Sequence, residues 1–228
     1  MERTRFRFGR NYTQHLPFGY ATYSPWFEDW FQEIYTKAKD HTMVTEDRCY
    51  ILYRLSQHCS HLEGDFAECG VYKGGTAYII AYALKRRSVQ HKPLHLFDTF
   101  AGLPPMVDDD PSGLKPGQFG DVSIEDVKDY LQSFPFVFFH AGVIPEAFGE
   151  VTERRFAFVH VDVDLYQTAK DCCLFFYDRM ASGSMLVFDN YGFQPYRAAE
   201  KRAVDEFFND KPESVISLPT GQCIVIKV

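Results

Sequence analysis

Two patterns of apolar residues divide the chain. Between Ser24 and His61 the apolar positions recur every three or four residues, which is typical of amphipathic helices. From Phe66 onward, short apolar runs that end in Gly or Asp alternate with longer amphipathic stretches. These patterns predict an N-terminal helical cap segment over 1–62 and an α/β core over 63–228, which together form a single structural domain.

The short apolar runs predict strands at Phe66–Val71, Pro93–Phe97, Phe136–His140, Phe156–Val161 and Ser184–Phe188. The stretches between them predict helices at Gly75–Arg87, Ser123–Ser133, Gln167–Met180 and Tyr196–Asn209. Strands that are apolar on both faces and alternate with helices indicate a doubly wound, mostly parallel sheet covered on both sides. Two last runs, separated by Pro-Thr-Gly-Gln, predict a C-terminal antiparallel hairpin at Ser214–Leu218 and Cys223–Val228.

Composition and charge exclude several classes of protein. With 46% hydrophobic and 17% aromatic residues among 228, the chain has ample material for a core. The 24 Lys and Arg residues are outnumbered by 31 Asp and Glu, a formal net charge of −7. Nucleic acid is therefore not expected as a partner, because phosphate binding needs a basic surface. No apolar run approaches the ~18 residues that cross a bilayer, so no membrane association is expected.

Cysteine usage predicts the cellular compartment. The six cysteines are Cys49, Cys59, Cys69, Cys172, Cys173 and Cys223. They form no C-x-x-C pair, and two of them are adjacent, which suits neither a zinc knuckle nor a disulfide framework. The four arginines within Met1–Arg10 are not followed by the apolar segment of a secretory signal. We therefore expect reduced thiols in a cytoplasmic protein.

A glycine-rich turn follows the first strand of the predicted core, Glu68-Cys69-Gly70-Val71-Tyr72-Lys73-Gly74-Gly75-Thr76. Its glycines let a strand turn tightly into a helix and let a ligand approach the backbone. The spacing matches neither G-x-G-x-x-G nor the Walker A motif, which disfavours a pyrophosphate cradle. Glu68 places a carboxylate where a cationic amino or sulfonium group would be favoured; a tight turn with a surface Glu is the alternative.

The second strand of the predicted core ends at Asp98, where doubly wound folds hold a ribose through its hydroxyls. Taken alone, Asp98 is equally compatible with a helix cap or a turn. Together with the glycine turn it predicts ribose binding. The following stretch Ala101–Gly120 is rich in Pro, Gly and Asp and falls inside the α/β run, so it predicts a lid or an insert and not a linker.

Acidic side chains end two further strands. Strand alternation places His160, Asp162 and Asp164 on one face, with successive Cα atoms roughly 6.5 Å apart. The next strand ends in Asp189 and Asn190. Carboxylates that emerge together are costly unless a cation lies between them, and hard cations prefer oxygen ligands. Asp162, Asp189 and Asn190 therefore predict a Mg²⁺ site. A helix cap at Asp164 and a turn at Asp189-Asn190 explain each motif separately but not their meeting, and His160 is predicted to be a satisfied core residue.

At this point the chain resembles the macrocin O-methyltransferase family, the S-adenosylmethionine-dependent enzymes that methylate sugars of macrolide and related antibiotics. The resemblance covers roughly Thr42 to the end of the sequence. It rests on the motifs Thr42-Met43-Val44, Gly64–Gly75, Phe97-Asp98-Thr99-Phe100-Ala101-Gly102-Leu103-Pro104, Asp162-Val163-Asp164-Leu165-Tyr166, Asp189-Asn190-Tyr191-Gly192 and Ala203-Val204-Asp205-Glu206-Phe207.

The resemblance implies roles for individual residues. Thr42 and Met43 belong to a segment that closes over the cofactor, Glu68 and Gly70 face its amino acid part, and Asp98 holds its ribose. The turn that shapes the cofactor site consists of Tyr72, Gly74, Gly75 and Thr76. Asp162, Asp189 and Asn190 match the family's Mg²⁺ ligands, and Asp164 matches the acid proposed as general base, so Asp162 and Asp164 are the expected catalytic residues. Asn190 stands where the family often has a second Asp, and an amide oxygen is an acceptable ligand.

The expected reaction is methyl transfer from S-adenosylmethionine to a hydroxyl of a small molecule, a sugar or polyol part of a natural product. A metal-dependent nucleotide-sugar glycosyltransferase that uses Asp162-Val163-Asp164 as its D-x-D motif, and a non-catalytic cofactor-binding protein, are the alternatives. The aromatic helical segment that contains Trp26 and Trp30 is compatible with a cover over the acceptor pocket and with a dimer interface. A homodimer or higher homo-oligomer is expected.

Overall fold

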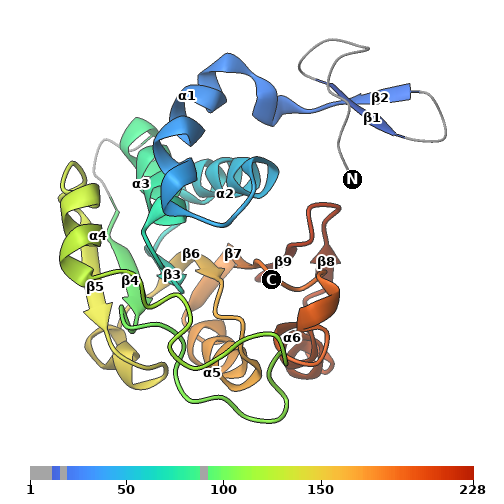
Figure 1. Cartoon of the computed structure of the whole chain (residues 1–228). Coiled ribbons are helices and arrows are strands. Elements are labelled where there is room, and N and C mark those ends of the chain that lie inside the picture. Colours follow the sequence, from blue (N-terminus) through green and yellow to red (C-terminus); the bar gives the residue numbers. More distant parts are fainter. Residues whose placement is uncertain (1–11, 16–19, 88–91) are drawn as a thin grey trace.

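The computed structural model describes residues 12–15, 20–87 and 92–228. Its main element is a seven-stranded sheet in the order β5-β4-β3-β6-β7-β9-β8. The strands are β3 (Asp65–Cys69), β4 (Leu94–Asp98), β5 (Val137–Ala141), β6 (Phe156–Val161), β7 (Met180–Phe188), β8 (Val215–Ser217) and β9 (Cys223–Ile226). Strands β3 to β7 pair in parallel, whereas β9 runs antiparallel to both β7 and β8. The predicted doubly wound sheet with a C-terminal antiparallel hairpin is confirmed (Figure 1).

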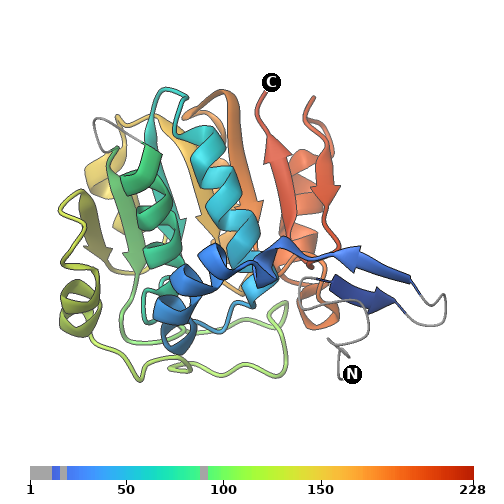
Figure 2. The same cartoon turned by 90° about the horizontal axis from the view of Figure 1, so that it is seen from above.

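Helices cover both faces of this sheet (Figure 2). The helices whose side chains share one core cluster are α1 (Asp29–Ala38), α2 (Glu46–Cys59), α3 (Gly75–Arg87) and α4 (Ile124–Leu131). The second cluster contains side chains of α5 (Tyr166–Tyr177), α6 (Glu200–Phe208) and the 3-10 helix η3 (Glu146–Val151). Shorter 3-10 helices lie at η1 (Pro25–Phe27), η2 (Lys39–His41) and η4 (Gln194–Tyr196). The sheet is therefore buried on both faces, which explains its nearly continuous apolar strands.

Most predicted elements lie within a few residues of their observed bounds. Helix α3 and strand β6 have the predicted limits, and Ser123 caps α4 by accepting the N–H of Asp126 at 3.1 Å. The last helix begins four residues later than predicted. Pro195 lies in a 3-10 turn, and Ala199 has non-helical backbone angles (φ −103°, ψ −105°), so α6 can begin only at Glu200.

The N-terminal segment departs from the prediction in one respect. A hairpin of β1 (Tyr12–His15) and β2 (Tyr20–Tyr23) precedes the helices, with Tyr12 paired opposite Tyr23. It projects from the rest of the molecule in both views (Figures 1 and 2). The mixed polar and aromatic residues of this stretch have no clear hydrophobic period, so the sequence predicts no strand here and the whole segment was predicted to be helical. Met1–Arg10, where no secretory signal is expected, lies outside the described residues.

The predicted cap segment also contributes to the main core. Leu52 and Tyr53 of α2 lie in the same buried cluster as Ile79 and Ile80 of α3. Residues 38–42 also approach the start of α3 closely. Gly75, the first residue of α3, permits this approach, because a Cβ there would lie 2.7 Å from the carbonyl oxygen of Ala38 and from the Cβ of Thr42. The start of α3 and the 38–42 segment thus touch backbone to backbone.

The state of the cysteines and the length of the apolar helices can be compared with the expectations from the sequence. All six cysteines are buried and free. In the part of the chain that the structure describes, no helix has the length and apolarity required to cross a membrane.

The topology determines where a ligand can bind. Strand β3 lies between β4 and β6, so the chain moves outward from β3 in one direction through β4 and in the other through β6. In doubly wound sheets, ligands bind beyond the carboxyl ends of the strands at this point of reversal.

Candidate active site

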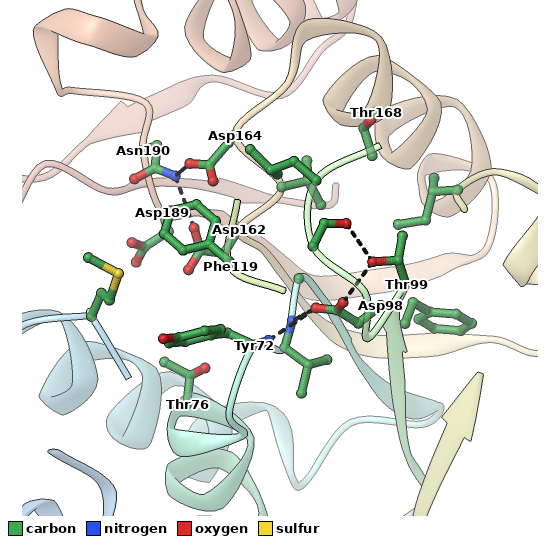
Figure 3. Close-up of a pocket in the computed structure, with 18 of the residues that line it drawn as sticks. Tyr72, Thr76, Asp98, Thr99, Phe119, Asp162, Asp164, Thr168, Asp189 and Asn190 are labelled. Atoms are coloured by element: carbon green, nitrogen blue, oxygen red, sulfur yellow. Dashed lines mark hydrogen bonds between the residues drawn. The ribbon is translucent and has the colours of Figure 1, made fainter. Parts of the chain in front are cut away.

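A cavity of about 350 Å³ lies at the carboxyl ends of β3, β4, β6 and β7. Its size is within the ordinary range for small-molecule sites. Ten of the thirteen predicted site residues line it: Thr42, Met43, Gly70, Tyr72, Thr76, Asp98, Asp162, Asp164, Asp189 and Asn190. Figure 3 shows Tyr72, Thr76 and Asp98 on one side of the cavity and the carboxylates of β6 and β7 on the other. The remaining three, Glu68, Gly74 and Gly75, lie outside its lining.

The glycine turn brings two strand ends into backbone contact. Gly70 has φ +84°, and a Cβ on it would lie 1.9 Å from the carbonyl oxygen of Asp162. Only glycine fits there, because both the backbone angle and the close approach exclude a side chain. Tyr72 also has a positive φ of 48°. The turn therefore holds the end of β3 tightly against the acidic end of β6.

Asp98 joins the ends of β4 and β3. Its Oδ2 accepts the N–H groups of Val71 (2.6 Å) and Tyr72 (3.0 Å), and its Oδ1 accepts the N–H of Phe100 (2.8 Å). Asp98 thus fixes two turns. Thr99 Oγ1 lies 3.5 Å from Oδ1, but its single proton has a closer acceptor in the Gly102 carbonyl oxygen at 2.6 Å. Each carboxylate oxygen can accept about two hydrogen bonds, so Oδ1 retains an acceptor position at the cavity for a further hydroxyl.

Glu68 was expected to face the amino acid part of the cofactor, but its side chain does not line the cavity. It is fully buried, and its Oε1 lies 2.7 Å from Nδ1 of His160, which is also fully buried. The parallel register of β3 and β6 places the two residues opposite each other. Burial opposes the imidazolium form, but the adjacent carboxylates of Asp189 and Glu68 prevail and raise the pKa of His160 to about 10. His160 is therefore a core residue, as expected, and its raised pKa favours the charged form behind the cavity wall.

Asp162, Asp164 and Asn190 meet as predicted. The Asn190 amide donates from Nδ2 to Asp162 Oδ1 (2.9 Å) and to Asp164 Oδ1 (2.8 Å), and Figure 3 shows it between the two carboxylates. Removal from water, followed by the charges of Asp189 and Asp164, raises the pKa of Asp162 well above its usual value. Burial likewise raises the pKa of Asp164 to about 6.

The backbone at Asp164 is unusual. It has φ +64°, and the Leu165 N–H donates to the Val163 carbonyl oxygen at 2.7 Å, which forms a γ-turn centred on Asp164. Non-glycine residues rarely adopt this conformation, and such strain is concentrated at functional sites. The turn presents the Asp164 carboxyl at the cavity.

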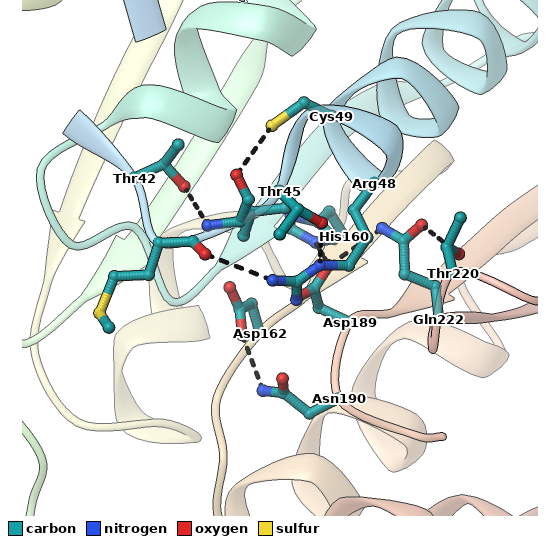
Figure 4. Close-up of polar contacts among 12 residues, drawn as sticks. Thr42, Thr45, Arg48, Cys49, His160, Asp162, Asp189, Asn190, Thr220 and Gln222 are labelled. Atoms are coloured by element: carbon teal, nitrogen blue, oxygen red, sulfur yellow. Dashed lines mark hydrogen bonds and ion pairs between the residues drawn. The ribbon is translucent and has the colours of Figure 1, made fainter. Parts of the chain in front are cut away.

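Asp189 is fully buried and surrounded by donors. Arg48 Nη1 forms an ion pair with its Oδ2, and Gln222 Nε2 donates to its Oδ1 at 2.9 Å. His160 Nε2 lies 3.6 Å from the same Oδ1 (Figure 4). Although burial opposes ionisation, the adjacent His160 and the Arg48 charge lower the pKa of Asp189. Asp189 is consequently a carboxylate.

Whether the three acids and Asn190 can hold a divalent cation depends on their arrangement and on the charges around them. Within the described residues, no group of three or more His, Cys, Asp or Glu side chains is arranged as a metal site. The chemistry of the set nevertheless fits: three carboxylates and one amide converge, and neither Asp162 nor Asp164 pairs with a described Lys or Arg. Burial, together with the charge of Asp189, raises the pKa values of these two acids, and a bound cation would oppose that shift.

The N-terminal segment and the loop after β4 complete the cavity. Thr42, Met43 and Val44 line one side, and Thr42 Oγ1 accepts the Val44 N–H at 3.0 Å. Leu103 and Phe119, from the loop predicted as a lid or insert, also line the cavity. Two acids anchor the middle of this loop to helices on the second face of the sheet.

One of these anchors is Asp110, whose Oδ1 accepts the N–H of Tyr166 at the start of α5 (2.9 Å). The other is Asp109, which pairs with Arg202 of α6 at 2.7 Å. The loop is therefore an ordered wall of the cavity, attached at points distant in sequence.

Sequence reasoning missed several residues of the site. Arg48, Phe193 and Tyr196 line the cavity, and Gln222 and Glu200 support it from outside. Glu200 is fully buried, and its Oε1 accepts the Asn190 N–H at 2.8 Å. Burial, followed by the charge of Asp162, raises the pKa of Glu200 well above its usual value. A partial signal for Arg48 was its position four residues after Val44, the end of the segment expected to close over the cofactor.

A doubly wound sheet with a glycine turn, an acid after β4 and a group of acids after β6 and β7 defines a class I methyltransferase type of site. The macrocin O-methyltransferase (TylF) family model matches residues 28–215. The chain belongs to this family, and so to the O-methyltransferases.

Known proteins agree with this assignment. The demethyldecarbamoylnovobiocin O-methyltransferase of Streptomyces niveus is 23% identical over 189 residues, which cover 75% of this chain and 68% of that protein. The structure of the O-methyltransferase NovP has a similar fold, with a TM-score of 0.72 and 21% identity over 86% of this chain and 88% of that one. An O-methyltransferase from Bacillus cereus, solved in complex with SAH, matches with a TM-score of 0.57 and 12% identity over 86% and 90%.

Proposed function

We propose that the protein transfers a methyl group from S-adenosylmethionine to a hydroxyl of an uncharged small natural product, with a divalent cation at Asp162, Asp189 and Asn190. The observation that carries the proposal is the cavity itself. It joins the turn and Asp98, which suit a nucleoside, to a group of oxygen ligands at the neighbouring strand ends. A site with these two parts can hold a cofactor and an acceptor side by side.

The cofactor is assigned to the β3–β4 side. Asp98 Oδ1 retains an acceptor position for a ribose hydroxyl, and Tyr72 and Thr76 line the cavity beside it. Thr42 and Met43 cover this region from the N-terminal segment. The similar fold of the Bacillus cereus enzyme, solved with SAH, supports the same class of cofactor here.

When bound, S-adenosylmethionine supplies the methyl group and the divalent cation supplies Lewis acidity toward the acceptor hydroxyl. The chain's own residues align the two reactants at the cavity, so that the methyl carbon leaves the sulfonium sulfur as the acceptor oxygen attacks it. Asp164 accepts the proton that the hydroxyl loses. The products are the methyl ether and S-adenosylhomocysteine.

The acceptor is assigned from the charge of the lining. Of the described residues that line the cavity, Arg48 is the single Lys or Arg, and it is already paired with Asp189. Four carboxylates line the same cavity: Asp98, Asp162, Asp164 and Asp189. A phosphate or carboxylate on the acceptor would be repelled. Leu103, Pro104 and Phe193 add apolar surface, which suits a sugar or polyol carried on an apolar skeleton.

The two alternatives lead to different expectations. Family membership favours methyl transfer over a nucleotide-sugar glycosyltransferase. A non-catalytic cofactor-binding protein would show cofactor binding without turnover.

We also propose a homodimer or higher homo-oligomer. Trp30 of α1 is 40% exposed although it belongs to an otherwise buried aromatic group. Light scattering after size-exclusion chromatography measures the oligomeric state directly, and a monomer at micromolar concentration would contradict this part.

The first test is calorimetric titration of the purified protein with S-adenosylhomocysteine. We expect binding, a clear loss of affinity in Asp98→Ala, and little change in the matched control Asp108→Ala, whose side chain is exposed on the nearby loop. If S-adenosylhomocysteine does not bind at millimolar concentration, the proposed methyltransferase function is overturned. Labelled cofactor and a panel of neutral polyhydroxylated acceptors then test transfer, and full turnover in chelator would remove the metal from the proposal.

A further inference from the structure

The ion pair between Arg48 and Asp189 lies inside the proposed metal site. The Arg48 side chain is 10% exposed and that of Asp189 is 1% exposed, so solvent screens their attraction little. Gln222 Nε2 donates to the other oxygen of Asp189 at 2.9 Å, and His160 Nε2 lies 3.6 Å from that oxygen. Both carboxylate oxygens of a proposed ligand are thus engaged by the protein's own groups.

The Arg48 guanidinium is held in this position from several directions. Its Nη2 donates to the Met43 carbonyl oxygen at 3.3 Å, and its Nε donates to Thr45 Oγ1 at 3.2 Å. Its Cζ lies 5.1 Å from the centre of the Phe193 ring. Figure 4 shows the group between the N-terminal segment and the end of β7. The ion pair is therefore a built feature and not a chance contact of a flexible side chain.

The second proposed ligand group is engaged in a similar way. The Asn190 amide directs its NH₂ toward Asp162 and Asp164. The carboxylates at this edge of the sheet consequently receive donors from Arg48 and Asn190 where a divalent cation would bind. Two cations at one carboxylate repel each other strongly in a site removed from water.

We propose that Arg48 is the resident counter-ion of Asp189 and competes with the divalent cation for that carboxylate. This inference rests on the proposed function, because it concerns the metal part of the same site. Cation binding at Asp189 then weakens the Arg48 pair, and Arg48 is bonded to the backbone of Met43 in the segment that lines the cofactor side of the cavity. Occupancy of the metal site and the affinity for the cofactor are coupled through this one side chain.

The test measures Mn²⁺ binding by electron paramagnetic resonance, in which free Mn²⁺ loses its signal on binding. The variant is Arg48→Met, which removes the charge at similar length. The matched control is Arg54→Met on the same helix, whose exposed side chain contacts Gln57 and Tyr50. We expect Arg48→Met to bind Mn²⁺ about 10-fold more tightly than the wild type, and Arg54→Met to bind it unchanged.

The possible outcomes separate this inference from the proposed function. Equal or weaker Mn²⁺ binding by a folded Arg48→Met protein overturns the role of Arg48 and leaves the metal site standing. No Mn²⁺ binding by any of the three proteins overturns the metal site, and the role of Arg48 with it. If Arg48→Met does not fold, Arg48→Gln, which retains a donor without the charge, is measured against the same expectation.

A second measurement tests the coupling in the wild type alone. Titration of S-adenosylhomocysteine with and without saturating Mn²⁺ is expected to show affinities that differ about 5-fold or more. Identical affinities would overturn the coupling through Met43.

Discussion

Gly70 and Asp162 touch backbone to backbone, since a Cβ on Gly70 would lie 1.9 Å from the Asp162 carbonyl oxygen. This contact sets the distance between the cofactor turn and the acidic strand end. We expect Gly70→Ala to destabilise the fold by about 3 kcal/mol or more, because the positive φ and the backbone clash add. Chemical denaturation measures the difference. Gly113→Ala is the control, since a Cβ there meets nothing within 4 Å, and equal stability of the two variants would contradict the role of the contact.

Asp164 should control the rate and its dependence on pH. Because burial raises its pKa to about 6, the carboxyl becomes a base only as the pH rises through that value, so the wild-type rate should increase with pH there. We expect Asp164→Asn to lower kcat about 10²- to 10⁴-fold and to leave the affinity for S-adenosylhomocysteine nearly unchanged. A variant that keeps the wild-type kcat and pH profile would show that another group accepts the proton.

His160 predicts a pH dependence of stability. Its pKa of about 10 in the fold lies above the ordinary value of 6.5, so its stabilising effect is complete below pH 6.5 and is lost as the pH rises through 10. We expect the melting temperature to fall by about 5 °C or more across this interval. The slope should be shallower in His160→Gln. A wild-type melting temperature that rises over the same interval would contradict a charged His160.

Asp110 supplies a helix cap from a distant loop. The residue before α5 provides no side-chain cap, and Asp110 Oδ1 accepts the Tyr166 N–H instead. We expect Asp110→Ala to cost about 1 kcal/mol of stability and to accelerate hydrogen exchange in residues 101–120. Asp108→Ala, at an exposed position of the same loop, serves as the control. Unchanged exchange in Asp110→Ala would show that the loop is held by other contacts.

Local patterns account for most of the sheet and for the acids at its edge. Strand β6 was predictable because all its residues except His160 are apolar, and the meeting of Asp162, Asp164 and Asn190 followed from parallel strands that end at one edge. The pair of Glu68 and His160 depends on the register between β3 and β6, which no local pattern specifies. The prediction therefore assigned Glu68 to the cofactor although its partner lies inside the core.

Arg48 escaped prediction for a related reason. Its side chain contacts Asp189, which is 141 positions away in the sequence, and no local pattern specifies a contact at that separation. The hairpin β1–β2 was missed because its residues lack an apolar period, and composition does not reveal the backbone pairing that places Tyr12 opposite Tyr23.

The buried carboxylate of Asp189 receives Arg48 from helix α2 and Gln222 from the residue directly before β9. During translation these groups leave the ribosome far apart in time. A growing chain that has released α2, β3 and even β7 still lacks the residue that holds the second oxygen of Asp189. The Asp189 carboxylate therefore has both of these donors only after residue 222 has emerged, however early α2 and β7 are made.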